Sequence, residues 1–215
     1  MPRCLNCKQK FEPKRFLQKH CESADCEKSA QQHLDDKIAK ALKTVKQKKK
    51  QDWNKEKIEI KEKLKTLSEW HNDLQKEINA IVRELDRDHP CISSQRSLGK
   101  SYDAGHLFGR QSNPQIRYHL FNIFAQSVHD NQWKSGNQLE FVDGIEKTFG
   151  TEIKEYCLSL KGFPELKMSV DDIKEKIPIA RSILKWVKLQ ERKFTTEDRI
   201  SLRKRFNQEI GIYNQ

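Results

Sequence analysis

Five polar residues in the middle of the sequence have the types and spacing for metal-assisted cleavage of a phosphodiester bond. In chain order they are Asp103, His106, Asn122, Asn131 and Asn137. A histidine can activate water as a general base, and carboxylate and amide oxygens suit a hard divalent cation. That cation would neutralise charge on the phosphate and on the leaving oxygen. Taken singly, each residue also fits a packed or surface position.

The elements around these residues must bring them together. Two short runs, 102–108 and 116–121, have the composition of strands and are separated by a loop that contains Gly and Pro. We expect His106 towards the end of the first strand, Asn122 after the second, and Asn131 near the start of a short helix. A strand–strand–helix unit of this kind could hold one divalent ion against a phosphate.

Changes in composition divide the chain into four zones. They are a cysteine module (1–28), a lysine-rich helical arm (29–89), a central core (90–150) and a C-terminal helical region (151–215). The arm carries apolar residues at helical spacing. Its stretch 46–65 has too few apolar positions to be buried, which predicts either a projecting helix or a break between two helices. The fold class is therefore α+β, mostly helical, with a small ββα core flanked by helices.

Two local patterns mark helix positions in the C-terminal region. Ser169 and Thr195 are each followed three residues later by Asp, which resembles a capping box. Pro178 falls inside an apolar pattern and is expected to kink that helix.

Four cysteines near the N-terminus have the spacing of a zinc site. The pattern is Cys4-x2-Cys7-x13-Cys21-x4-Cys26, in which two close pairs can complete a tetrahedral, structural zinc site. A segment this short buries too little apolar surface to fold alone, so a metal would supply the missing free energy. Disulfides or free thiols are the alternative, and His20 could replace Cys21 as a ligand.

The charge balance points to nucleic acid. The 215 residues hold 42 Lys and Arg against 31 Asp and Glu, a net charge of +11. Twelve lysines between Lys37 and Lys65 face four acidic residues, so most of the excess lies in the arm. Such a segment could follow a phosphate backbone, or it could be a solvated helix face. No apolar run suits a membrane span or a secretory signal, so we expect a cytoplasmic protein without a membrane partner.

Several strings of residues together resemble the NinG/Rap family of phage recombination proteins. They are Arg87-Asp-His-Pro-Cys-Ile-Ser, Asp103-Ala-Gly-His106, Gln115-Ile-Arg-Tyr, Asn122-Ile, Asn131-Gln and Lys134-Ser-Gly-Asn137. The resemblance is densest over 78–140 and extends to the cysteine module and the arm. That family consists of HNH-type (His-Asn-His) nucleases described as endonucleases acting on branched recombination intermediates.

The resemblance implies a role for each residue of the central group. His106 would be the general base, Asn122 would hold the loop that orients it, and Asn131 would help to bind a catalytic Mg²⁺ or Mn²⁺. Asp103 is the candidate second ligand of that ion, and Asn137 is a reserve ligand or a substrate contact. The cellular setting would be a bacterium that is infected by a phage or carries a prophage.

The sequence departs from the family at a second set of cysteines. Where family members commonly carry two further cysteine pairs, this chain has Cys91, Ser94, Ser127 and Asp130. Phe124 stands where the resemblance leads us to expect His. We expect hydrogen bonds and apolar packing, with Phe124 and Trp133 involved, in place of the second metal, and Cys91 as a buried thiol. A decayed nuclease is the alternative.

The resulting hypothesis is a metal-dependent endonuclease that hydrolyses branched DNA, such as Holliday junctions or D-loops. Two alternatives remain, a non-catalytic zinc-containing DNA-binding protein with a relic nuclease core and an HNH nuclease of linear duplex. A two-fold homodimer is a further hypothesis, because a symmetric junction has two strands to cut. The expected phosphate contacts are Arg96, Lys100, Arg110, Arg117, Lys134, Lys48, Lys49 and Lys50.

Overall fold

The computed structural model describes residues 1–133 and 136–213 and is mostly helical, with a small sheet. The chain forms two compact units, Met1–Leu64 and Lys65–Gln215, which are described separately. Among the described helices, none combines the length and the apolar character that a membrane crossing requires.

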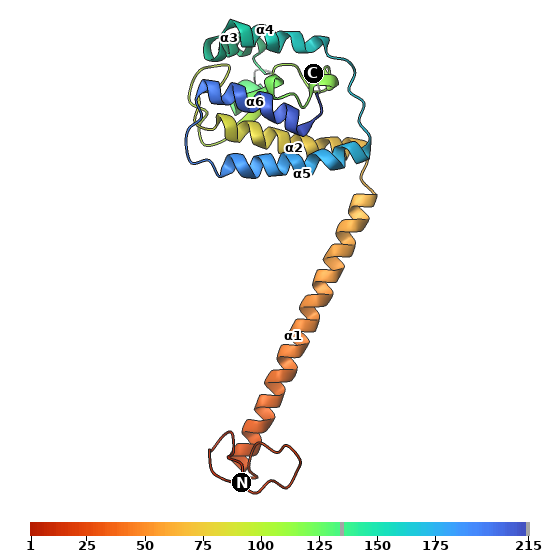
Figure 1. Cartoon of the computed structure of the whole chain (residues 1–215), viewed down its shortest axis with the longest axis vertical. Coiled ribbons are helices and arrows are strands. Elements are labelled where there is room, and N and C mark those ends of the chain that lie inside the picture. The colour runs from red at the N-terminus through yellow and green to blue at the C-terminus, as the bar shows by residue number, and fades with distance from the viewer. Residues whose placement is uncertain (134–135, 214–215) are drawn as a thin grey trace. The chain divides into compact units, whose positions relative to one another are not determined.

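The first unit is a cysteine-containing loop followed by one long helix, α1 (Ala24–Lys63) (Figure 1). Acidic residues lie in its first turn and lysines in its last, which complements the helix dipole. Cys26 lies inside α1 and is the buried residue of that helix. Most of the polar stretch continues α1, and the chain leaves the helix at Leu64. The sequence predicted either a projecting helix or a break between two helices in this stretch. The structure has a long helix that is followed by a break at Leu64.

The second unit is built on α2 (Leu67–Asp86), which packs along α5 (Val170–Lys188) and lies near α6 (Thr196–Ile210) (Figure 1). From Trp70 to Leu85 the apolar stripe of α2 is buried in the largest apolar cluster of the core. The capping boxes at Ser169 and Thr195 are present, as the sequence predicts. The helix that contains Pro178 runs without interruption from Val170 to Lys188.

A two-stranded antiparallel sheet holds the candidate site. Strand β1 (Tyr102–His106) pairs with β2 (Ile123–Ser127), with Asp103 opposite Gln126 and His106 opposite Ile123. A π-helical turn (His129–Trp133) follows β2, and helices α3 (Gln138–Phe149) and α4 (Thr151–Ser159) follow after it.

The prediction of a second strand at 116–121 is wrong. That stretch contains parts of two 3₁₀ turns, Pro114–Ile116 and Leu120–Asn122, and the strand begins at Ile123. The apolar residues of this stretch are buried in the core. Their burial explains the apolar composition, which we had interpreted as the pattern of a strand. Asn122 therefore precedes β2 instead of following it.

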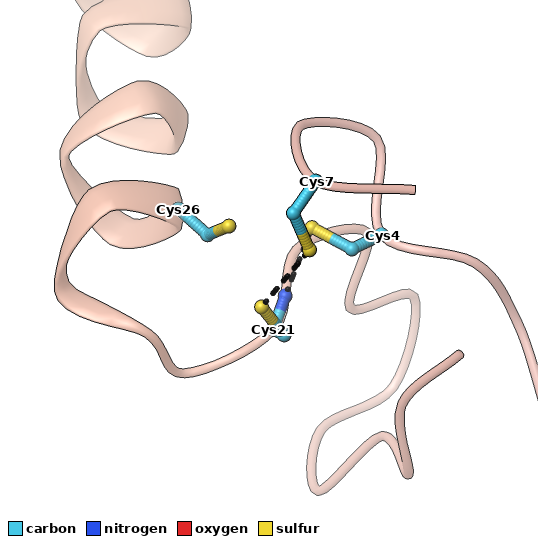
Figure 2. Close-up of side chains that lie close together, drawn as sticks. All are labelled: Cys4, Cys7, Cys21 and Cys26. Carbon is cyan, nitrogen blue, oxygen red and sulfur yellow. Dashed lines mark hydrogen bonds between the residues drawn. The ribbon is translucent and has the colours of Figure 1, made fainter. Parts of the chain in front are cut away.

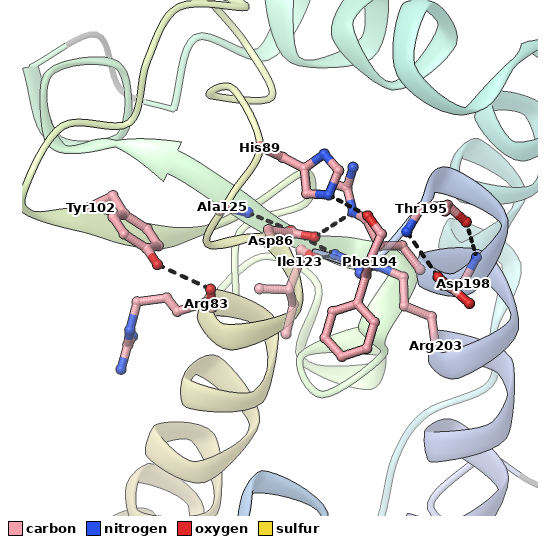
Figure 3. Close-up of polar contacts among 11 residues, drawn as sticks. Arg83, Asp86, His89, Tyr102, Ile123, Ala125, Phe194, Thr195, Asp198 and Arg203 are labelled. Carbon is pink, nitrogen blue, oxygen red and sulfur yellow. Dashed lines mark hydrogen bonds and ion pairs between the residues drawn. The ribbon is translucent and has the colours of Figure 1, made fainter. Parts of the chain in front are cut away.

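A buried ion group attaches the sheet to the helices (Figure 3). Asp86, at the end of α2, accepts hydrogen bonds from Arg199 Nε (2.9 Å) and Arg203 Nη2 (2.8 Å) of α6. It also accepts one from the backbone N–H of Ala125 in β2 (2.9 Å), and Arg203 donates to the carbonyl of Ile123. Burial raises the pKa of Asp86, but the two guanidinium charges outweigh this and lower it. Three elements are thus held at one carboxylate.

Candidate active site and metal centre

The four N-terminal cysteines converge from separate segments (Figure 2). Cys4 and Cys7 lie on one loop, Cys21 lies just before α1, and Cys26 lies in its first turn. Their sulfur atoms all lie within 4.8 Å of one another, and Cys7 Sγ is 3.7 Å from Cys21 Sγ. Tetrahedral zinc with Zn–S bonds of ~2.3 Å holds its sulfurs ~3.8 Å apart. The four thiols therefore fit a structural zinc ion.

Backbone N–H groups favour the thiolate form of Cys4, which is the form that a metal needs. Burial raises the pKa of Cys4, but hydrogen bonds from the backbone of Cys21, Cys7 and Asn6 outweigh this and lower it to about 5. The Cys21 N–H lies 3.4 Å from Cys4 Sγ. His20, the alternative ligand, is outside the group of converging side chains, which consists of the four cysteines.

The structure brings together three of the predicted central residues. Asp103, His106 and Asn131 line one open cavity of about 410 Å³. Asp103 Oδ2 accepts hydrogen bonds from Asn131 Nδ2 (2.9 Å) and from Gln132 Nε2 (2.9 Å). The side chains of Asp103 and Asn131 are thus in direct contact. The oxygen donors suit Mg²⁺ or Mn²⁺, which keep several waters and need few protein ligands.

His106 is neutral at physiological pH in this setting. Burial and the charge of Arg110 lower its pKa to about 4. Its Nε2 lies 3.2 Å from the carbonyl of Arg117 and 3.3 Å from Gln75 Nε2, so the tautomer decides whether it donates or accepts. A neutral imidazole is the form that can take a proton from water.

Asn122 is fully buried and holds both ends of the loop between the strands. Its Oδ1 accepts from the N–H of Phe108 (2.9 Å), and its Nδ2 donates to the carbonyls of Phe108 (3.1 Å) and Ile116 (3.2 Å). Phe108 lies two residues after His106. The side chain of Asn122 therefore fixes the backbone path that leads out of β1.

Asn137 lies apart from this group. Its Nδ2 donates to Asp130 Oδ1 (3.3 Å) and to Glu140 at the start of α3. It supports the turn after β2, and it is not among the residues that line the cavity of Asp103.

A hydrogen-bonded group, here called the Asp130 network, occupies the positions where the resemblance led us to expect cysteines. Asp130 Oδ2 accepts from Ser127 Oγ (2.7 Å) and from Cys91 Sγ (3.3 Å), and the Ser127 N–H points to Cys91 Sγ (3.2 Å). Burial raises the pKa of Asp130, but hydrogen bonds from Ser127, Ser94, Cys91 and Asn137 lower it far below its usual range. Cys91 is fully buried, as expected.

The two aromatic residues expected to support this region behave differently. Phe124 is fully buried and packs against Phe141 and Phe149. Trp133 is 79% exposed, so the prediction that it packs here is wrong. It lies in the last position of the π-helical turn, where its side chain faces solvent.

The predicted DNA contacts are scattered. Arg110 lines the cavity of His106, and Arg117 lies beside it but is held by Gln75 Oε1 (3.3 Å) and by the ring of Tyr118. Arg96 lines a different cavity of about 640 Å³. Lys100 and the α1 residues Lys48, Lys49 and Lys50 are exposed. Lys134 lies outside the described residues.

Sequence reasoning missed the contribution of α2 to this site. Gln75 contacts His106 and Arg117, and Asn79 and Arg83 line the same cavity. These three residues recur every four positions, so they form one polar row on a helix. The signal was therefore present in the sequence, as a polar row beside an apolar stripe.

The fold and these two groups define a helical protein with a cluster of four cysteines that could hold a zinc ion and a small hairpin that presents an Asp–Asn–His group. The family described as "Bacteriophage Lambda NinG protein" matches residues 1–208, and the chain belongs to this NinG family.

Curated relatives agree with the family match. The chain is 40% identical over 89 residues to "Protein ninG" of Enterobacteria phage H19B, covering 41% of this chain and 44% of that protein. It is 39% identical over 89 residues to the Escherichia phage lambda protein, with the same coverage, and 42% over 78 residues to that of Salmonella phage P22 (36% and 38%). The aligned part thus spans less than half of each relative. No solved structure matches the chain.

Proposed function

We propose that this protein is an HNH-type, metal-dependent endonuclease that hydrolyses phosphodiester bonds in branched DNA. The observation that carries the proposal is the placement of Asp103, Asn131 and His106 around one cavity, on an antiparallel hairpin followed by a helical turn. The buried Asn122 supports it, because its amide fixes the loop that leaves β1 beside the proposed base.

Each residue has a distinct part in the proposed reaction. Asp103 and Asn131 would hold one Mg²⁺ or Mn²⁺, which would neutralise charge on the phosphate and on the leaving oxygen. His106, neutral above pH ~5 because its pKa is about 4, accepts a proton from the attacking water. Arg110, exposed at the edge of the cavity, contacts a neighbouring phosphate. The preference for branched over linear DNA rests on membership of the family.

The test measures cleavage of a synthetic four-way junction and of a linear duplex with the same arm sequences, with and without Mg²⁺. We expect His106→Ala to cut ~10²–10⁴-fold more slowly, the usual contribution of a general base. Asn131→Ala should bind the junction but lose metal-dependent cutting. His33→Ala, on exposed α1, is the matched control. If His106→Ala cuts as fast as the parent, the proposed base is wrong, and faster cutting of the linear duplex would refute the branched preference.

A non-catalytic DNA-binding role is the second candidate. One observation favours it. Asp103 Oδ2 accepts hydrogen bonds from the side-chain amides of Asn131 and Gln132, so this carboxylate could serve only to hold the turn against β1. Junction binding without Mg²⁺-dependent cutting by the parent protein would support this role.

A further inference from the structure

A loop in the first unit presents two large apolar side chains to solvent. Phe16 is 94% exposed and Leu17 is 74% exposed, although the same module buries Phe11 against Cys4 and Cys26. The module therefore has an apolar interior, and these two side chains stay outside it.

The loop is held in this shape by its own hydrogen bonds. Gln18 Oε1 accepts from the N–H of Lys14 (2.8 Å) and of Arg15 (3.3 Å), and Gln18 Nε2 donates to the carbonyl of His20 (2.8 Å). Leu17 has a φ of 60°, a left-handed conformation that is costly for a leucine. One glutamine side chain thus bridges both sides of the tip and holds Phe16 and Leu17 outward.

Positive charge surrounds the tip. Lys14, Arg15 and Lys19 are exposed. Lys14 pairs with Glu22 at 2.8 Å, whereas Arg15 and Lys19 form no ion pair with any carboxylate in the described part of the chain. The same unit continues into α1, which carries most of the lysine excess. The apolar tip is therefore flanked in the sequence by two cations, Arg15 and Lys19, that can attract phosphates.

We propose that Phe16 and Leu17 form a wedge that inserts at a distorted or unpaired base step of DNA, with Arg15 and Lys19 on the flanking phosphates. Apolar wedges of this kind enter between base steps and bend the duplex, and aromatic side chains stack on unpaired bases of any sequence. Two side chains match one base step, but they offer far less area than a stable protein interface needs.

The wedge proposal rests on the proposed function, in which DNA is the partner. It adds the site at which the protein would recognise the branch point. It assigns recognition to the first unit and cutting to the second. The two functions can therefore be measured separately in the full-length protein.

The experiment titrates full-length protein with a four-way junction and with a linear duplex of the same arms, over a range of salt concentrations. We expect Phe16→Ala to weaken junction binding ~5–100-fold, the usual effect of losing one base–aromatic stack, with an unchanged salt slope. Leu17→Asn, which tolerates the left-handed backbone, should act in the same direction. Arg15→Ala combined with Lys19→Ala should instead reduce the salt slope by about 1–2, since each phosphate contact contributes ~0.9.

Three controls make the result decisive. Leu139→Ala, at an 84% exposed residue of the second unit, should bind the junction like the parent protein. Zinc content per chain should equal that of the parent in every variant, which shows that the module is folded. A 2-aminopurine base at the branch should gain fluorescence on binding the parent protein, and this gain should disappear in Phe16→Ala.

The outcomes separate this proposal from the proposed function. If Phe16→Ala binds and cuts the junction like the parent, the wedge is refuted and the nuclease stands. If binding depends on Phe16 but the parent never cuts, the wedge stands and the nuclease is refuted. Loss of binding to anionic phosphatidylserine vesicles in Phe16→Ala, with DNA binding unchanged, would assign the tip to a membrane and overturn the proposal.

Discussion

Two groups of four residues in this protein hold separate segments of the chain together in different ways. The cysteine cluster (Cys4, Cys7, Cys21 and Cys26) brings four thiols within 4.8 Å of one another. The Asp130 network (Cys91, Ser94, Ser127 and Asp130) has one carboxylate and three groups that can donate protons to it. Four thiolates repel one another and need a metal, whereas a carboxylate with donors holds together through hydrogen bonds.

The surroundings of the two groups explain the difference. In the first unit, the buried apolar set around the cysteines is limited to Phe11 and the cysteines themselves. In the second unit, Cys91 is buried in an apolar cluster with Leu98 and Ala125, and Ser127 is the last residue of the strand β2. A hydrogen-bonded group can replace a metal only where neighbouring packing already fixes the backbone, because its net contribution to stability is small. Substitutions in each group in turn test whether the cysteine cluster needs a metal and the Asp130 network does not.

The largest effect is expected in the cysteine cluster. Cys4→Ser together with Cys26→Ser should reduce the zinc content from one per chain to none. Because structural zinc contributes ~10–16 kcal/mol in small modules, residues 1–23 should lose their hydrogen-exchange protection, while the protection of α2 and α5 stays the same. Cys157→Ser, in the core of the second unit, should keep the zinc. Retained zinc in the double variant would show that the cluster is not the metal site.

A smaller effect is expected from removing the acceptor of the Asp130 network. Asp130→Ala leaves the buried Cys91 and the Ser127 hydroxyl without their shared partner. It should lower the free energy of unfolding of the second unit by ~2–4 kcal/mol. The control is Asp143→Ala, at an exposed residue that lines the same cavity of about 640 Å³ as Asp130. It should change the free energy of unfolding by less than ~0.5 kcal/mol. Chemical denaturation of both variants measures the difference, and equal values would mean that the network contributes nothing.

The network should also make stability depend on acidity. The pKa of Asp130 is lower in the folded protein than its unfolded value of ~3.9, so its contribution is fully present above that value and is lost as the pH falls below it. Asp130→Asn should flatten the decrease in stability below pH ~4. Denaturation curves between pH 2.5 and 6 measure this slope. A slope identical to that of the parent would place the titration elsewhere, for example at Asp86.

The smallest effect is expected from Cys91→Ser. A serine hydroxyl can donate to Asp130 Oδ2 as the thiol does, so the free energy of unfolding should fall by less than ~1 kcal/mol, with zinc content unchanged. The same substitution at Cys4 should abolish the zinc site. Equal consequences of Cys→Ser at both positions, in zinc content and in denaturation midpoint, would contradict the distinction between the two groups.

The sequence was informative where local rules operate. The spacing of the cysteines predicted their convergence, and Ser169 and Thr195 predicted two helix starts, because capping needs only residues three positions apart. The strings around His106 and Asn131 predicted the family. The second strand was misplaced because the apolar run ending at Phe121 is buried in turns, and burial makes a sequence apolar whatever its backbone conformation.

By itself, the sequence determined the family, the metal-type cysteine pattern, the basic arm and the list of polar residues at the candidate site. Only the tertiary structure decided which of these residues meet. It placed Gln75 of α2 beside His106, gathered Cys91 and Ser127 around Asp130, and directed Phe16 away from the interior that buries Phe11. The reason is physical, because contacts between distant segments depend on how helices and strands pack, and one sequence without its fold does not contain that geometry.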